Sequence, residues 1–322
     1  MRGLHTYIHF LLLGISSATF SQRIDQSALY RHIDHPTYLR IHYENDFFVM
    51  TDQYYTQGMQ VEYVHPGLKK NPVSYLLLRL KHHRQYGLSV EHNAYTPTTI
   101  LSDSILYRDR PYAAGLFLKS FSISTDTVRK LRISNGWTLG VIGPAAGAKE
   151  MQQGVHKLTG NYAPLGWQYQ IRNDLALNYE VNMEKLVFAV RRSFTLHADL
   201  QLKTGTLNNK IQAGFTIMTG KIPSLFLLPQ LPDNDFYLYL YVQPLVSLVG
   251  YDATLQGGVF NRSSPHILNA SEISRLTLEN HTGVVVRYRK AQAEAFVSLL
   301  TKEFNSGKPH RWGGLKLSLA LD

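Results

Sequence analysis

The sequence predicts an all-β protein, a transmembrane antiparallel β-barrel of about twelve strands with a short helix in an extracellular loop. Apolar and polar residues alternate with period two in about twelve segments. Many of these segments reach the roughly 9–11 residues that a tilted strand needs to cross a membrane. The chain also begins like an exported protein. After that start, it has no apolar run of the roughly 18 residues that a membrane-spanning helix needs.

The first 22 residues, MRGLHTYIHFLLLGISSATFSQ, have the layout of a secretory signal peptide. Arg2 precedes an apolar run, and small residues follow it. We expect cleavage near Ser21 or Gln22, which divides the chain into a signal peptide, 1–21, and one outer-membrane barrel domain, 22–322. The alternative is an amphipathic helix that belongs to the mature domain.

Composition excludes several classes of chemistry. The chain has 322 residues and no cysteine, so disulfides, cysteine nucleophiles and thiolate metal sites are excluded. Its net charge of +10 suits an anionic partner such as a phosphorylated lipid surface. Export and the lack of a basic run disfavour nucleic acid. Basic residues scattered over a solvated surface are the alternative.

The alternation is clear in the segment where Leu196, Ala198, Leu200 and Leu202 interleave with polar residues. Aromatic residues gather toward segment ends, as expected of girdles at the membrane interfaces. We expect short links at 182–184 and 202–205 to be periplasmic turns. A secreted β-sandwich is the soluble alternative, since its strands also alternate. The predicted strand segments are 37–49, 55–65, 85–93, 111–124, 130–142, 167–181, 185–202, 205–220, 235–257, 272–289, 291–304 and 311–321.

One helix interrupts the strands. Within residues 143–166, the stretch from Ala148 to Leu158 is bounded by Gly147 and Gly160 and predicts about three helical turns. His156 lies on this helix and is a candidate general base, because histidine titrates near neutral pH. A surface or packing role is the alternative reading of a lone histidine.

The connection ENDFFVMTDQYYTQG, residues 44–58, is unusually rich in polar side chains. Asn45 and Asp46 end the first predicted strand, and Thr56 lies near the start of the second, so antiparallel pairing brings them close. A carboxylate, an amide and a hydroxyl form a plausible oxygen ligand set for Ca²⁺. Ordinary turn hydrogen bonds are the alternative. We expect four aromatic residues here to lie at the membrane interface: Phe47, Phe48, Tyr54 and Tyr55.

Several motifs together resemble the LpxR-like lipid A deacylases of Gram-negative outer membranes. They are YYTQG at 54–58, DRPYAAG at 109–115, GVIGPAAGAKEMQQGVHKLTG at 140–160 and GWQYQIRND at 166–174. The resemblance implies a twelve-stranded barrel and calcium-dependent hydrolysis of the ester-linked 3′-acyl chains of lipid A. It also implies a site between the outer barrel wall and a helix from an extracellular loop, facing the outer leaflet.

The resemblance assigns roles to four residues. It implies that His156 activates water, that Asp46 holds Ca²⁺, that Asn45 and the metal stabilise the oxyanion, and that Thr56 shapes the metal site. The family's catalytic lysine has no counterpart between Lys81 and Lys119. Two arginines in that stretch are the candidate replacements, Arg108 and Arg110. Six positions after the histidine, where the family has a glutamate, this chain has Tyr162.

The implied partners are lipid A or lipopolysaccharide as substrate and outer-membrane lipids as surroundings, with the protein acting as a monomer. Two alternatives differ in kind. One is a non-catalytic barrel, either a pore or a lipopolysaccharide-binding protein. The other is an outer-membrane esterase that acts on a phospholipid.

Overall fold

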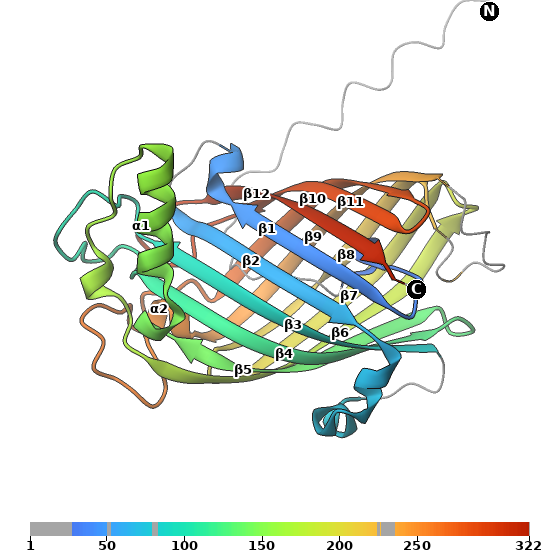
Figure 1. The fold of residues 1–322 in the computed structure, drawn as a ribbon, viewed down its shortest axis with the longest axis horizontal. Coiled ribbons are helices and arrows are strands. Elements are labelled where there is room, and N and C mark those ends of the chain that lie inside the picture. Colours follow the sequence, from blue (N-terminus) through green and yellow to red (C-terminus); the bar gives the residue numbers. More distant parts are fainter. Residues whose placement is uncertain (1–27, 50–52, 79–82, 224–225, 227–235, 322) are drawn as a thin grey trace, which may run out of the picture.

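The computed structural model describes residues 28–49, 53–78, 83–223, 226 and 236–321. The predicted signal peptide lies outside them. Within the described residues, twelve strands form one closed antiparallel barrel in which each strand pairs with its sequence neighbours and β1 pairs with β12 (Figure 1). The strands are β1 (Tyr38–Asn45), β2 (Tyr54–Val64), β3 (His83–Thr96), β4 (Ala113–Asp126), β5 (Leu131–Ile142), β6 (Asp174–Val190), β7 (Phe194–Gly205), β8 (Asn208–Lys221), β9 (Phe236–Asp252), β10 (Leu276–Tyr288), β11 (Ala291–Leu300) and β12 (His310–Ala320).

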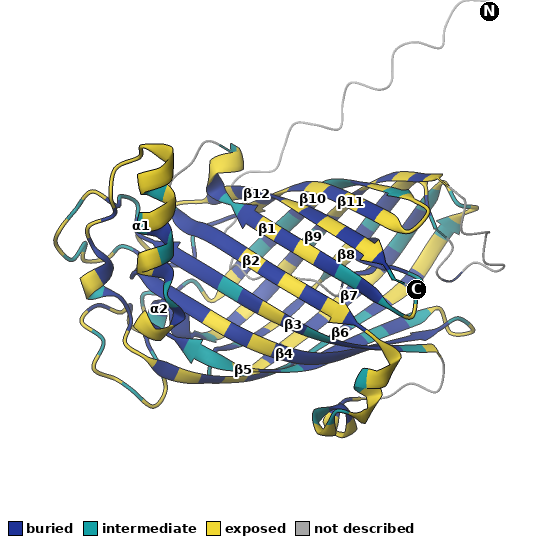
Figure 2. Cartoon of the chain, in the orientation of Figure 1, coloured by how far each residue is buried: buried dark blue, intermediate teal, exposed yellow. Residues whose placement is uncertain are grey.

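Burial in the barrel is inverted relative to a soluble protein. In β7, Leu200 and Leu202 are exposed while Asp199 and Gln201 are buried. Figure 2 shows the same alternation as stripes along the strands. A soluble sandwich places its apolar face inside, so this pattern rules out the sandwich. Apolar side chains outside and polar side chains inside are expected of a barrel surrounded by lipid.

The two ends of the barrel differ. Helix α1 (Ala148–Thr159), the short helix α2 (Ala253–Gln256) and the connections 97–112, 143–173, 253–275 and 301–309 lie at one end, here called the long-loop end (Figure 1). The turns 127–130, 191–193 and 289–290 lie at the other, the short-turn end. The short 3₁₀ helices are η1 (Leu29–Arg31), η2 (Asp46–Val49), η3 (Pro66–Lys70), η4 (Pro72–Leu76), η5 (Pro144–Ala146) and η6 (Trp167–Tyr169). Among the described residues, no helix is long and apolar enough to cross a membrane.

Both predicted turns in the middle of the chain are wrong. Residues 182–184 lie inside β6, where Asn182 and Glu184 point into the barrel. The alternation continues through them, so nothing interrupts the strand, and the turn comes at 191–193. Residues 202–205 are the last residues of β7, and the link to β8 comes after them, at 206–207.

The segment before β1 enters the barrel and fills its interior at the short-turn end. The Tyr30 ring is fully buried and stacks on Tyr241, with ring centroids 3.6 Å apart. Arg31 Nε donates to both carboxylate oxygens of Glu294, at 3.0 and 3.1 Å. Tyr239 donates its hydroxyl to the carbonyl oxygen of Tyr30 at 2.7 Å. Residues 28–31 therefore act as a plug inside the barrel at its short-turn end.

Candidate active site

The end of β1 separates an inward carboxylate from an outward amide. Glu44 points into the barrel, where it accepts a hydrogen bond from Trp312 Nε1 at 2.9 Å. This structural role was not predicted for Glu44. Asn45 lies on the opposite face, the one that also carries exposed Ile41 and Tyr43. The strand ends there because Asp46 begins η2 and its Oδ2 accepts the backbone N–H of Gln53 at 2.8 Å.

A β-bulge at the start of β2 sets the direction of Thr56. The register with β3 shifts between Tyr55 and Gln57, which leaves Thr56 as the extra residue. Its hydroxyl lies 2.8 Å from that of Thr96 on β3. Of the four aromatic residues expected at the interface, Phe47 and Phe48 are exposed, but Tyr54 and Tyr55 are buried. The bulge explains Tyr55, whose ring turns inward and contacts Tyr95 and Trp312.

Helix α1 agrees closely with the predicted range. Gly147 and Gly160 bound it with φ of 75° and 73°, in the left-handed region that favours glycine. The helix lies against the outer wall of the barrel (Figure 1). Gln57 Nε2 contacts Met151 Sδ at 3.4 Å, and His92 Nε2 lies 3.1 Å from the carbonyl oxygen of Ala146 just before the helix.

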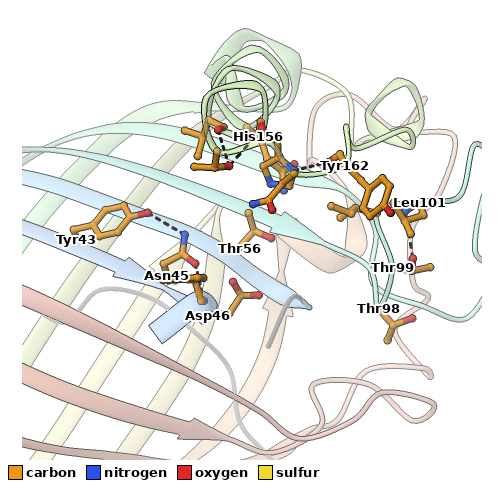
Figure 3. A pocket seen from close by; sticks show the side chains of 15 residues that line it. Tyr43, Asn45, Asp46, Thr56, Thr98, Thr99, Leu101, His156 and Tyr162 are labelled. Atoms are coloured by element: carbon orange, nitrogen blue, oxygen red, sulfur yellow. Dashed lines mark hydrogen bonds between the residues drawn. The ribbon is translucent and has the colours of Figure 1, made fainter. Parts of the chain in front are cut away.

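The space between α1 and the wall is a pocket of about 770 Å³. All four residues that the sequence singled out line it: Asn45, Asp46, Thr56 and His156. Figure 3 shows His156 on the helix, above Asn45 at the end of β1, Asp46 at the start of η2 and Thr56 on β2. The remaining lining residues are Tyr43, Phe47, Thr98, Thr99, Ile100, Leu101, Gln152, Val155, Thr159, Asn161 and Tyr162.

One hydrogen bond determines which nitrogen of His156 carries a proton. Nδ1 lies 2.6 Å from the backbone carbonyl oxygen of Tyr162 (Figure 3). A carbonyl only accepts, so Nδ1 is the donor and Nε2 of the neutral ring holds the lone pair. Tyr162 stands at the position where the resemblance led us to expect a glutamate, and its main chain provides an acceptor for the histidine.

Gln152, four residues before His156 on α1, is one of the polar residues at helical spacing on this helix, and the sequence assigned it no role. Its Oε1 accepts a hydrogen bond from Trp167 Nε1 at 2.7 Å, and both side chains are buried. This bond fixes which end of the amide is oxygen. Nε2 has no hydrogen-bond partner among the described residues. The i, i+4 spacing from His156 was the available signal, since such residues share one helix face.

The arginines proposed as replacements for a lysine lie elsewhere. Arg110 is buried at the mouth of the barrel, where it pairs with Glu303 and donates to Thr254 Oγ1 at 2.8 Å. Arg108 does not line the pocket. The loop after β3 instead contributes the hydroxyls of Thr98 and Thr99.

The residues that line the pocket offer a few oxygen ligands for a cation such as Ca²⁺. Asp46 is the one carboxylate among the described residues that line the pocket, and the Thr56 hydroxyl and Asn45 amide line it too. Ca²⁺ accepts carboxylate, amide and water oxygens in flexible geometry. The described residues include no cluster of three His, Asp or Glu side chains that could hold a metal ion. The donor chemistry therefore fits a weakly held Ca²⁺ completed by water.

Comparisons with known proteins agree with this architecture. The family model described as outer membrane protein LpxR matches residues 8–321. The solved structure of LpxR from Salmonella typhimurium is similar, with a TM-score of 0.72, 19% identity, and coverage of 88% of this chain and 100% of that one. The β domain of the Bordetella autotransporter BrkA has a TM-score of 0.48 and 8% identity, over 89% of this chain and 99% of that one. No curated protein matches. Because the family model spans nearly the whole sequence, this chain belongs to the LpxR family of outer membrane proteins.

Proposed function

We propose that this protein hydrolyses the ester bond of the 3′-acyloxyacyl group of lipid A at the outer membrane. The observation that supports this most is the position of the pocket. It joins a histidine, a carboxylate, an amide and a hydroxyl on the outer wall, next to exposed apolar side chains, and not in the barrel interior. A substrate embedded in the surrounding leaflet reaches such a pocket sideways. That access suits an amphiphile better than a solute crossing a pore.

The proposed chemistry is direct hydrolysis by water. His156 Nε2 takes a proton from a water molecule, whose oxygen attacks the ester carbonyl carbon. The carbonyl oxygen becomes an oxyanion that accepts hydrogen bonds from amide N–H groups. When the carbon–oxygen bond to the sugar breaks, His156 returns its proton to the departing alkoxide. The products are a free fatty acid and a hydroxyl on lipid A.

Two amides are available as donors to that oxyanion. Asn45 Nδ2 gives one N–H to the Tyr43 hydroxyl at 3.0 Å, and its second hydrogen is left for substrate. Its Oδ1 accepts the backbone N–H of Phe47 at 2.7 Å, which holds the nitrogen in place. Gln152 offers a second amide whose orientation Trp167 holds. Both are preorganised donors, and this lowers the reorganisation cost of the reaction.

We propose that Asp46 and Thr56 hold Ca²⁺ in the pocket. When bound, this cation supplies positive charge that offsets the charge of the oxyanion. The main-chain bond to Gln53 fixes the Asp46 carboxylate at the pocket edge. The long-loop end, which carries this pocket, then faces the outer leaflet, because long loops are typical of the extracellular side of such barrels.

The test uses the purified protein in detergent with purified lipopolysaccharide. Mass spectrometry of the lipid A should show loss of the 3′-acyl groups with wild type and Ca²⁺. The rate should fall by about 10²–10⁴-fold with His156→Ala. Lys157→Ala is the matched control, since that neighbour on α1 does not line the pocket.

Other outcomes identify the alternatives. Activity that persists in a calcium chelator with Mg²⁺ present would remove Ca²⁺ from the proposal. Release of fatty acid from phospholipid but not from lipid A would indicate the phospholipid esterase. If the acyl pattern of lipid A is unchanged in every condition, the alternative of a non-catalytic barrel is the one supported.

A further inference from the structure

The connection between β2 and β3 folds back over the outside of the barrel at the short-turn end. Its described part, residues 65–78, is here called the strap and contains η3 and η4. Figure 1 shows it outside the wall, where β2 ends. Asn71 begins η4, and its Oδ1 accepts the N–H of Val73 at 3.1 Å. The Ser74 hydroxyl donates to the carbonyl oxygen of Leu68 at 3.0 Å, which fastens η4 to η3.

Hydrogen bonds attach the strap to outward-facing residues of β4 and β5. Asn71 Nδ2 donates to Ser120 Oγ at 3.2 Å. Leu78 donates its N–H to Asn135 Oδ1 at 2.9 Å and accepts from Asn135 Nδ2 at 3.2 Å. Ser120 lies on the same face of β4 as exposed Leu118, so it points away from the barrel interior. The strap thus covers polar groups on the outer wall.

The uncovered side of the strap is amphipathic. Tyr75, Leu76 and Leu78 are 69%, 68% and 51% exposed. Lys69 and Lys70 end η3 and are also exposed. Apolar side chains beside lysines characterise segments that lie in the membrane interface, with the apolar groups among acyl chains and the ammonium groups near phosphates.

We propose that the strap is a lipid-binding element that rests in the leaflet at the short-turn end of the barrel. Tyr75, Leu76 and Leu78 enter the acyl boundary, and Lys69 and Lys70 contact lipid phosphates. Two observations select lipid over a protein partner. The strap is anchored to the lipid-facing wall, so its apolar side continues the apolar surface of the barrel, and its charges match an anionic headgroup layer. The proposal is independent of the reaction in the pocket.

The chain has no cysteine, so one engineered cysteine gives a unique label. Leu76→Cys with a nitroxide label is reconstituted in vesicles of phosphatidylglycerol and phosphatidylethanolamine. Val128→Cys is the matched control, because Val128 is 80% exposed in the plain turn after β4 at the same end. The measured quantity is the collision rate of the nitroxide with oxygen, which dissolves in the acyl region, and with a nickel chelate, which stays in water. At position 76 the rate with oxygen should exceed the rate with the chelate at least threefold. At position 128 the rate with the chelate should be the higher one. Equal ratios at the two positions would overturn the proposal.

A second arm tests the lysines and the protein alternative. Reversing both charges, Lys69→Glu with Lys70→Glu, should raise the nickel-to-oxygen ratio at position 76 at least twofold. Arg289→Glu, in another turn at the same end, should leave that ratio unchanged. An unchanged nickel-to-oxygen ratio in the Lys69→Glu, Lys70→Glu variant would overturn the proposed contact between these lysines and lipid phosphates. A label that is water-exposed in vesicles but protected in native outer membranes would also overturn the proposal, in favour of a protein partner.

Discussion

The hydrogen bond from Trp167 to Gln152 offers a sharp test of the proposed site. Trp167→Phe keeps an aromatic ring against Tyr112, whose centroid lies 4.9 Å away, but removes the Nε1 donor. Gln152 Oε1 then loses its buried partner, which costs about 1–3 kcal/mol. The amide can recover part of this by turning over, which exchanges the positions of Oε1 and Nε2, so that an oxygen stands where the proposed mechanism needs a donor.

That reversal is unfavourable for the reaction, because a carbonyl oxygen would face the developing oxyanion. If the cost of restoring the donor is about 1–3 kcal/mol, the rate falls roughly 5-fold to 160-fold, since 1.36 kcal/mol corresponds to a factor of ten. We expect the loss in kcat more than in KM, because the donor acts on charge that develops only in the transition state.

The assay is the rate of acyl release from purified lipopolysaccharide, followed by mass spectrometry. Tyr169→Phe is the matched control: it removes a donor from the same short helix η6, where the Tyr169 hydroxyl donates to the exposed carbonyl oxygen of Asp103 at 3.3 Å. Heat-modifiable mobility on gels verifies that both variants fold. Equal rates for the two variants would refute the role assigned to Gln152.

Three further predictions test the plug, the barrel mouth and the cation site. Arg31→Met removes the ion-pair partner of the buried Glu294 carboxylate, which keeps its hydrogen bond from the Tyr241 hydroxyl. The free energy of unfolding in urea should therefore fall by about 3–5 kcal/mol, and adding Glu294→Gln should recover most of it. At the mouth, burial outweighs the attraction of Arg110 and raises the pKa of Glu303 to about 7. Its folded pKa therefore exceeds the unfolded one, so the contribution of Glu303 to stability is fully present below about pH 4.5 and is lost as the pH rises through 7. The protection factors of the amides in residues 301–309, which are exchange rates corrected for intrinsic base catalysis, should be lower at pH 8.5 than at pH 5.5, and Glu303→Gln should abolish the difference. Asp46→Asn should raise the Ca²⁺ concentration for half-maximal deacylation at least tenfold, while activity unchanged at every Ca²⁺ level would count against Asp46 as the ligand.

Local patterns in the sequence were sufficient to predict much of the fold. Alternation identified the strands because one side of the barrel wall meets lipid and the other a polar interior. Gly147 and Gly160 marked α1 because both adopt positive φ. The same signal failed at Asn182, since alternation alone does not show where a long strand ends. Tyr55 faced inward because a bulge changed the register, and nothing in the local pattern reveals a bulge.

The candidate site was only partly predictable, for a related reason. Its four expected residues share one pocket, as the resemblance implied. The contacts that orient them join distant segments and involve atoms that motifs do not specify. The acceptor for His156 is a main-chain oxygen, which any residue at position 162 would offer. Gln152 acquires its orientation from Trp167, on a different element.

The polar side chains inside the barrel argue against the alternative that this protein is a pore. A channel requires water along the inward-facing side chains, but a buried inward polar residue can be found on each of the twelve strands. Many of them form pairs, as Arg132 does with Glu184 and Lys119 with Glu180. The plug residues Tyr30 and Arg31 add to this filling. These buried polar side chains occupy the described interior, so the proposed chemistry is assigned to the outer surface at the long-loop end. One inward residue from each strand, β1 to β12, is Arg40, Gln60, Glu91, Lys119, Arg132, Asn182, Asp199, Gln212, Gln243, Glu279, Glu294 and Lys316.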